Sequence, residues 1–413
     1  CCPVDGAPLA SIAFGDRLVI GTDWIEGRAG RDARLRRIAD CLSIAVANLI
    51  QDRLRFAIAV AGTAVPILLV LLQMALLQGV RTEVTRLYND FDFDIALLPV
   101  TYEYMFSSGV FDSVRLAQAQ AVDGVADTFA LNVDGGAWTG PAEKRSPLIV
   151  IGIDDKPRFI RDAEIRAGLS ALGTGADVLV DRYSSANFGP LAPGTNAFLD
   201  DHPVTIAGHF SLGMFFYADG AAIMRNVFLP PLSGASSRDV HIGLIALDPG
   251  ADPVRTKAAL IEALPPDVQV LTRNELIDGE QDFFLSTKPL GIMVTVGMAV
   301  AFLAGIVVLW QVLSAEIMRR INEFATLSAM GFGAPFVLGV GFCETFLLGM
   351  AAFLPAMLVG ALILQLLEWA THLPAAATPG LILKVLGIVL VMCGFCAASV
   401  ARRIARAQPA NLF

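Results

Sequence analysis

The chain has 413 residues, a formal net charge of −9 and 55% hydrophobic residues. Its mean hydropathy of +0.62 exceeds that of ordinary water-soluble globular domains, so a membrane protein is the first interpretation. The acidic balance gives no support for a nucleic-acid partner.

The first 38 residues show no helical periodicity and no basic stretch followed by an apolar one, so they do not resemble a signal peptide. We leave residues 1–38 as an unassigned N-terminal tail.

Four apolar runs are long enough to cross a hydrocarbon core of about 30 Å, which takes roughly 20 helical residues. These predicted membrane spans are residues 56–80, 289–313, 336–367 and 381–400. The third span contains one acid, Glu344, about nine residues inside it. A carboxylate at that depth is costly unless it is protonated or paired, so we favour an interhelical hydrogen bond over a proton relay.

Basic residues near the ends of the spans predict the orientation, because they accumulate on the cytoplasmic side. They are Arg31, Arg34, Arg36, Arg37, Arg53 and Arg55 before the first span, Arg319 and Arg320 after the second, and Arg402, Arg403 and Arg406 after the fourth. We therefore expect both termini (401–413 at the C-terminal end) and residues 314–335 to be cytoplasmic. Residues 81–287 and the short loop 368–380 are predicted to lie outside.

Residues 81–287 are too long for a loop and mix two periodicities. Short β-rich runs bounded by Gly, Pro and Asp predict strands at 91–100, 145–154, 176–184, 202–211 and 239–248. Helical patterns at 111–125 and 252–264 lie between them. The predicted fold class is an α-helical membrane protein with four transmembrane helices and an extracytoplasmic α+β domain between helices 1 and 2. A helical stalk at 81–90 and a return at 274–291 connect that domain to the membrane.

Few residues of the large domain suggest a catalytic or metal-binding site. His202, His209 and His241 do not have metal-ligand spacing, and ordinary hydrogen-bonded or surface roles are favoured. Asp90, Asp92 and Asp94 alternate with apolar residues, which favours a half-buried strand with a solvated acidic face over a calcium site. We identify no catalytic, cofactor or metal residues.

Two further patterns leave alternatives open. The loop with Met214, Phe215, Phe216 and Tyr217 either contacts a ligand or partner outside the membrane or belongs to the core. Cys393 and Cys396 could form a redox or metal pair, but an apolar helix without further ligands favours packing.

The chain contains no G-x-x-x-x-G-K-[ST] motif, so we expect no nucleotide site on it. If the cytoplasmic segment 316–330 is helical, one face carries Ile317, Ile321, Phe324 and Leu327, and the other carries Glu316, Arg319, Arg320 and Glu323. Gly331 would end the helix. Periodicity alone is equally consistent with a helix in the lipid headgroups and with a helix that receives a protein partner.

The sequence EFATLSAMGFGAPFVLGVGFCETFLLG resembles the region after the second span of FtsX-like permeases, the transmembrane subunits of MacB-type ABC transporters, and is most similar to the DevC-type permeases. Residues that fall on the family pattern are Glu323, Ala325, Thr326, Leu327, Ala329, Met330, Gly331 and Glu344. Phe324, Ser328 and Cys343 depart from it.

The resemblance extends over residues 42–413. LSIAVANLIQDRLRFAIAVAGTAVPILLVLLQMALLQGV is similar to the family's N-terminal amphipathic helix and first span, which implies a cytoplasmic amphipathic helix at 39–55. The ending RRIARAQPANLF is similar to the C-terminus of such permeases.

The resemblance implies a non-catalytic permease subunit of an ABC exporter in the bacterial inner membrane, working as a homodimer. ATP and Mg would be held by a separate ABC ATPase that docks on Ile317, Arg319, Arg320, Glu323, Phe324, Ala325, Leu327, Met330 and Gly331. A periplasmic membrane-fusion adaptor, an outer-membrane channel, membrane lipid and a lipid-like or amphiphilic cargo are the further expected partners. The alternative is an FtsX-like membrane regulator or receptor that signals to envelope partners without transport. A secondary transporter is disfavoured, because there are few spans and no visible inverted repeat.

Overall fold

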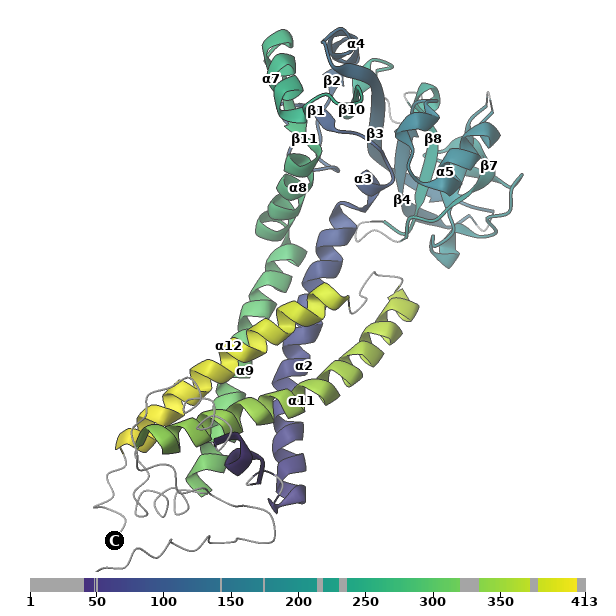
Figure 1. Ribbon diagram of the computed structural model, residues 1–413. Coiled ribbons are helices and arrows are strands. Elements are labelled where there is room, and N and C mark those ends of the chain that lie inside the picture. The colour runs from purple at the N-terminus through teal and green to yellow at the C-terminus, as the bar shows by residue number, and fades with distance from the viewer. Residues whose placement is uncertain are drawn as a thin grey trace, which may run out of the picture. The chain divides into compact units, whose positions relative to one another are not determined.

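The computed structural model (Figure 1) describes residues 41–406 except positions 48, 50, 142, 174, 214–217, 230–235, 320–333 and 372–377. The α-helices are α2 (Arg53–Val84), α3 (Arg86–Asn89), α4 (Val114–Gln120), α5 (Ala163–Gly168), α7 (Pro253–Ala263), α8 (Arg273–Thr287), α9 (Pro289–Arg319), α11 (Ala334–Thr371) and α12 (Pro379–Arg406). The strands are β1 (Ile95–Pro99), β2 (Phe111–Asp112), β3 (Val125–Thr139), β4 (Arg145–Ile153), β5 (Asp177–Asp181), β6 (Asn196–Leu199), β7 (His202–Phe210), β8 (Ala221–Arg225), β9 (Asp239–Val240), β10 (Ile242–Leu247) and β11 (Val268–Thr272). Short 3-10 helices are η1 (Pro157–Phe159), η2 (Leu169–Ala171), η3 (Ala186–Phe188) and η4 (Asn226–Phe228).

Four of the described helices are long and apolar enough to cross a membrane. They are Arg53–Val84, Pro289–Val312, Gly339–Trp369 and Pro379–Ala398, and each contains an 18-residue window with a mean hydropathy between 2.3 and 2.7. The shortest stretch has 20 residues, and a helix of that length is about 30 Å long. The predicted fold class, four such helices with an α+β domain between the first and the second, is confirmed.

The chain divides into two compact units. One contains Cys1–Val65, Ile306–Leu354 and Gly387–Phe413, and the other contains Pro66–Gly305 and Pro355–Leu386. The second unit holds residues 91–272, which we call the inserted domain. Each of the four long helices has its two ends in different units.

The inserted domain is built on a sheet in which nine of the described strands run in the order β11-β1-β10-β3-β4-β8-β5-β7-β6. The pairs β4–β8 and β5–β7 are parallel, and the other pairs are antiparallel. Helices α4 and α7 bury Leu116, Ala119 and Leu260 against Ile95 and Val270 of the first strands. This arrangement, with helices gathered on part of a mostly antiparallel sheet, is an α+β fold.

Strand β3 closes part of this sheet into a barrel. Its first half pairs with β10, and its last two residues, Trp138 and Thr139, pair with Leu199 and Phe198 of β6. The series β3-β4-β8-β5-β7-β6 therefore returns to β3. Trp138 is fully buried, stacks on Phe188 with 5.5 Å between ring centroids, and donates its ring N–H to the Phe188 carbonyl at 3.2 Å.

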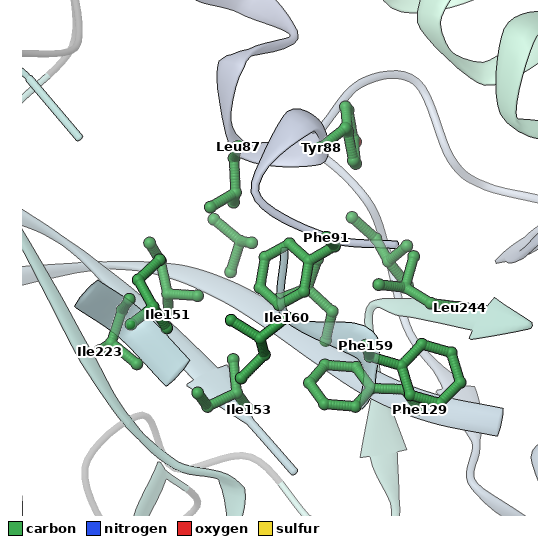
Figure 2. Close-up of a cluster of buried hydrophobic side chains, with 14 of the residues drawn as sticks. Leu87, Tyr88, Phe91, Phe129, Ile151, Ile153, Phe159, Ile160, Ile223 and Leu244 are labelled. Atoms are coloured by element: carbon green, nitrogen blue, oxygen red, sulfur yellow. The ribbon is translucent and has the colours of Figure 1, made fainter. Parts of the chain in front are cut away.

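A second buried cluster joins the inserted domain to the end of the first long helix. Figure 2 shows Phe91, Phe129 and Phe159 packed below the short helix α3, which carries Leu87 and Tyr88. All five side chains are at most 1% exposed. Because burying side chains of this size stabilises by roughly 1.5–3 kcal/mol each, α3 is firmly attached to the domain.

Local sequence signals fix where α7, the last helix of the inserted domain, and the following helix α8 begin. Asp252 accepts the Val254 N–H at 3.0 Å, and Pro253 occupies the first turn of α7. Thr272 and Glu275 form a reciprocal capping box at the start of α8.

Two helical segments form the stalk, the name we give to residues 76–89 of α2 and α3 together with α8. Phe284 of α8 is buried against Val80 of α2, and Val294 completes this cluster. The Gln281 amide donates to the Arg81 carbonyl at 3.3 Å. The first long helix thus continues into the stalk and lies beside α8 (Figure 1).

Candidate functional site

The predicted coupling segment lies mostly outside the described residues. Positions 320–333 include Arg320, Glu323, Phe324, Ala325, Leu327, Met330 and Gly331. Ile317 and Arg319 fall in the last turns of α9, which ends at Arg319, and α11 begins at Ala334. The structure therefore defines the two helices that flank the segment, and the role of the segment stays a prediction.

The predicted aromatic loop also lies outside the described residues, but its first end is defined. Its residues are Met214, Phe215, Phe216 and Tyr217. Just before them, the N–H groups of Leu212 and Gly213 donate to the Asp181 carboxylate at 3.1 and 2.8 Å. Gly213 has φ +98°, a conformation that favours glycine. A buried carboxylate thus holds the backbone that leads into the loop.

The stalk meets the inserted domain at a group of charged side chains that we call the junction: Glu83, Arg86, Asp90 and Asp181. Nη1 of Arg86 lies 3.7 Å from Oε2 of Glu83. The same Nη1 lies 2.7 Å from where a Cβ would stand at Gly213. Glu83 is 2% exposed and Asp181 is fully buried. A single guanidinium from the stalk therefore reaches both a buried stalk acid and the start of the aromatic loop.

Burial raises the pKa of two carboxyl groups in the junction, Asp90 and Asp181. Burial raises the pKa of Asp90 to about 7, with a further increase from Asp162 and opposition from Arg86. Burial also raises the pKa of Asp181, although the N–H donors of Leu212, Tyr183 and Gly213 oppose this shift. The junction therefore contains a carboxyl group that changes charge near neutral pH.

A tyrosine–glutamate cluster, formed by Tyr88, Tyr102 and Glu280, ties the two stalk helices to the domain. The Tyr102 hydroxyl donates to Oε1 of Glu280. The Tyr88 hydroxyl lies 3.0 Å from the same oxygen and 2.7 Å from the Tyr102 hydroxyl. Burial raises the pKa of Glu280 to about 7, against the lowering effect of both tyrosines. Tyr88 comes from α3, Glu280 from α8 and Tyr102 from the loop after β1, so one carboxyl group connects three segments.

A cavity of about 330 Å³ lies beside α4. Its polar wall is bonded internally: Asn132 donates to Asn226 at 3.0 Å, and Asn226 donates to Asp154 at 2.8 Å. The His241 N–H donates to Asn132 at 2.8 Å. Because these groups satisfy one another, the wall organises the sheet and offers a ligand few free donors.

The three histidines of the domain make ordinary contacts, as their spacing predicts. His202 is exposed. His209 Nε2 lies 2.6 Å from the Leu191 carbonyl, and His241 Nδ1 lies 2.8 Å from the Val133 carbonyl. Within the described part of the chain, no group of three His, Cys, Asp or Glu side chains is placed to hold a metal ion.

The D-x-D-x-D stretch shows the predicted alternation of burial but begins before the regular strand. Phe91 and Phe93 are buried while Asp92 and Asp94 are exposed, yet β1 starts only at Ile95. Asp92 pairs with Arg161 at 2.6 Å, and Asp94 accepts the Leu247 N–H at 2.9 Å. The acids thus add side-chain bonds to neighbouring segments beside the backbone bonds that Asp92 and Asp94 make with Phe159 and Ile245 before the regular strand.

Three residues that the sequence singled out in the membrane helices, Glu344, Cys393 and Cys396, are buried. Glu344 is 4% exposed in α11, and its role stays a prediction. Cys393 and Cys396 are buried and are not joined in a disulfide. A Cβ at Gly349 would lie 2.5 Å from the Cys393 sulfur, so α11 and α12 are in close contact there. The cysteine pair therefore has the packing role that the sequence favours.

The sequence did not point to the tyrosine–glutamate cluster or to the junction. Tyr88 and Glu280 are 192 positions apart, and Tyr102 and Glu280 are 178 apart. The signal available in the sequence was indirect: Glu280 lies at helical spacing between the apolar residues Leu276 and Phe284.

Comparison with known proteins gives a match in the membrane-spanning part. Residues 295–409 match the family described as FtsX-like permease C-terminal. These residues include most of α9 and all of α11 and α12. No curated protein matches the chain.

Solved structures share a limited similarity with less than half of the chain. The extracellular domain of the noncanonic ABC-type transporter YknZ from Gram-positive bacteria is 15% identical, covers 43% of this chain and 98% of its own, and gives a TM-score of 0.31. The periplasmic region of MacB from Actinobacillus actinomycetemcomitans is 9% identical, covers 47% and 94%, and also gives a TM-score of 0.31.

Proposed function

We propose that this chain transmits force in an ABC export complex. The premise is that residues 295–409 are the C-terminal domain of an FtsX-like permease, which is a non-catalytic transmembrane subunit of ABC systems. The family match is the observation that carries the proposal. The four long apolar helices and the domain between the first and the second support it.

The energy would come from ATP and Mg bound to a separate ABC ATPase. This ATPase would dock on the segment from Ile317 to Gly331, two copies of each subunit forming the complex. Helix α9 is continuous from Pro289 to Arg319, and α8 precedes it with only Lys288 between them. Displacement of the segment would thus reach the inserted domain through two consecutive helices.

We also propose a location, a subtype and further partners for the chain. We place the chain in a bacterial inner membrane, with cytoplasmic termini and a periplasmic inserted domain, because arginines flank the spans on one side. We assign it to the DevC type, acting with a periplasmic adaptor and an outer-membrane channel on an amphiphilic cargo. The residues from Met214 to Tyr217 are the proposed contact for cargo or adaptor, because Asp181 and Arg86 connect the start of that loop to the stalk.

The test is ATPase stimulation in reconstituted vesicles that contain the permease and its cognate ATPase. Glu323→Ala and Gly331→Ala should each reduce stimulation at least several-fold while the permease stays folded and inserted. Arg255→Ala, an exposed position on α7, is the control and should leave stimulation unchanged. Unchanged stimulation in both segment variants would remove this segment as the coupling element.

A second measurement separates export from regulation. ATP-dependent release of a fluorescent phospholipid to an acceptor, when the adaptor is present, supports export of an amphiphile. Intact stimulation with no release by any tested amphiphile, together with activation of an envelope hydrolase, would favour the regulator.

A further inference from the structure

We infer that the base of the stalk carries a binding site for the phosphate of an anionic phospholipid, formed by Lys288, Tyr104 and Phe283. Nζ of Lys288 lies 3.9 Å from the centroid of the Tyr104 ring and 5.5 Å from that of Phe283. The two rings stack with centroids 5.5 Å apart and planes at 19°. The inference depends on the membrane spans and not on the partner ATPase.

The ammonium group of Lys288 has no anion supplied by the described part of the chain. No carboxylate there lies within 4.0 Å of it. Other basic side chains, such as Arg115 and Lys156 of the inserted domain, do pair with acids. The aromatic rings hold the cation through their negative faces without neutralising it. Lys288 therefore keeps hydrogen-bond donors and a full charge for an external anion.

The Tyr104 ring is placed by a tight turn. The Ser107 N–H donates to the Tyr104 carbonyl at 2.8 Å, and the Glu103 N–H donates to the Ser107 carbonyl at 3.2 Å. Two residues earlier, Tyr102 donates to Glu280 on α8, which fixes the loop against the stalk. The aromatic support is thus built by the fold and does not depend on a loose side chain.

The position of Lys288 identifies the anion as a lipid headgroup. Lys288 directly precedes Pro289, the first residue of an apolar stretch that contains an 18-residue window with mean hydropathy 2.7. Exposed apolar side chains begin one turn later, at Ile292 and Met293. Lysine and tyrosine at the end of a span lie at headgroup level. An amphiphile with its phosphate at Lys288 would find an apolar surface for its acyl chains.

Lys288 also lies closer to the apolar zone than the corresponding cation of the neighbouring helix. Arg81 directly follows residues 56–80, the part of α2 without charged residues, and its carbonyl accepts from Gln281, about 10 Å along the helix from Lys288. Of these two cations, Lys288 is therefore the one that reaches the phosphate level of a lipid whose chains contact α9.

The experiment measures lipid retention by native mass spectrometry of the full chain, titrated with phosphatidylglycerol in phosphatidylcholine-containing micelles. We expect Lys288→Gln to require about fivefold more phosphatidylglycerol for half-maximal retention, the factor that corresponds to about 1 kcal/mol for one lysine at a membrane surface. Lys288→Arg should retain the lipid. Arg255→Gln, which removes an exposed charge on α7, is the matched control and should not change retention.

Two results would contradict the proposed site. One is that Lys288→Gln retains phosphatidylglycerol as well as the unmodified chain does. The other is that Arg255→Gln loses as much retention as Lys288→Gln does. A third arm adds inorganic phosphate at the same concentration. Displacement of phosphatidylglycerol by it would show a soluble-anion site and reject the lipid assignment. If Lys288→Gln does not fold, Tyr104→Leu serves instead, because it removes the ring and keeps the charge. Unchanged retention in that variant counts against the site, and weaker retention supports it.

Discussion

Glu280 is the residue whose environment has the clearest consequence for the chain. It is 2% exposed, accepts from two tyrosines, and has a pKa raised by burial to about 7. Because the folded-state pKa lies above the ordinary 4.5, the folded chain binds this proton more tightly than the unfolded chain. The resulting stabilisation is present below about pH 4.5 and is lost as the pH rises through about 7.

Glu280→Gln keeps an acceptor for the tyrosines and removes the charge. We expect the variant to melt at a higher temperature than the unmodified chain at pH 8 and at nearly the same temperature at pH 4.5. The difference at pH 8 should be at most about 3 kcal/mol. The measurement is thermal unfolding of the solubilised chain between pH 4.5 and 8.

The control for this pH profile is Asp278→Asn, an exposed acid on the same helix, two residues from Glu280. It should follow the pH profile of the unmodified chain. A Glu280→Gln profile parallel to that of the unmodified chain at every pH would contradict the assignment of the proton to Glu280.

Gly213→Ala should destabilise the chain by about 1–3 kcal/mol, because φ +98° is strained for a residue with a Cβ. The new methyl group would also lie 2.7 Å from Nη1 of Arg86, which must then move away from the junction. Thermal unfolding measures the loss. Gly194→Ala, which has φ +86° but open space around its Cβ, separates backbone strain from the contact with Arg86. Equal losses in the two variants would show that the contact is unimportant.

At the scale of elements, the contact between α11 and α12 depends on a glycine opposite a thiol. Gly349→Ala should lower the melting temperature, since its Cβ would stand 2.5 Å from the Cys393 sulfur. Cys393→Ala in the same chain should restore most of the loss by making space. The comparison requires both single variants and the double variant. A double variant no better than Gly349→Ala would place the strain elsewhere.

The strands that the sequence predicted and those that it missed differ in a physical way. The β-rich runs at 145–154, 176–184 and 202–211 became β4, β5 and β7, because each concentrates β-branched residues between turn-forming ones. Strand β3 was missed, although it has 15 residues and pairs with three other strands. It contains Gly135 and Gly136, which interrupt the local pattern, and its stability comes from partners distant in the chain.

In the candidate site, too, properties set by neighbouring residues could be predicted, and contacts between distant residues could not. Alternation along the chain predicted which of Phe91, Asp92, Phe93 and Asp94 are buried, because that property is local. The tyrosine–glutamate cluster could not be predicted, because it unites a stalk helix, a loop and a second stalk helix. Charge repulsion and burial at Asp90 likewise depend on neighbours that only the fold brings together.

At the scale of the whole molecule, the four spans require the inserted domain to lie on one side of the membrane and the segment between α9 and α11 on the other. We expect a protease site inserted between Asp200 and Asp201, in the turn between β6 and β7, to be cleaved from outside in intact spheroplasts. The same site in inverted membrane vesicles should be protected.

A protease site at position 327 serves as the reciprocal control for this orientation. It should be cleaved in inverted vesicles and protected in spheroplasts. Cleavage of the Asp200–Asp201 site only in inverted vesicles would reverse the proposed orientation.

The way the chain joins the inserted domain to the stalk determines which movements the sheet can withstand. The domain starts with β1 and finishes with β11, and these antiparallel neighbours pair Ile95 with Thr272 at the end attached to the stalk. Spreading the two stalk helices apart would load this pair as a zipper, breaking one hydrogen-bonded pair at a time from Ile95 onward. Sliding the helices along their axes would load all five residue pairs of the ladder at once, in shear. The sheet is therefore weak against spreading and strong against axial thrust, and the contacts of Glu280 and Gln281 across the stalk oppose the weak direction.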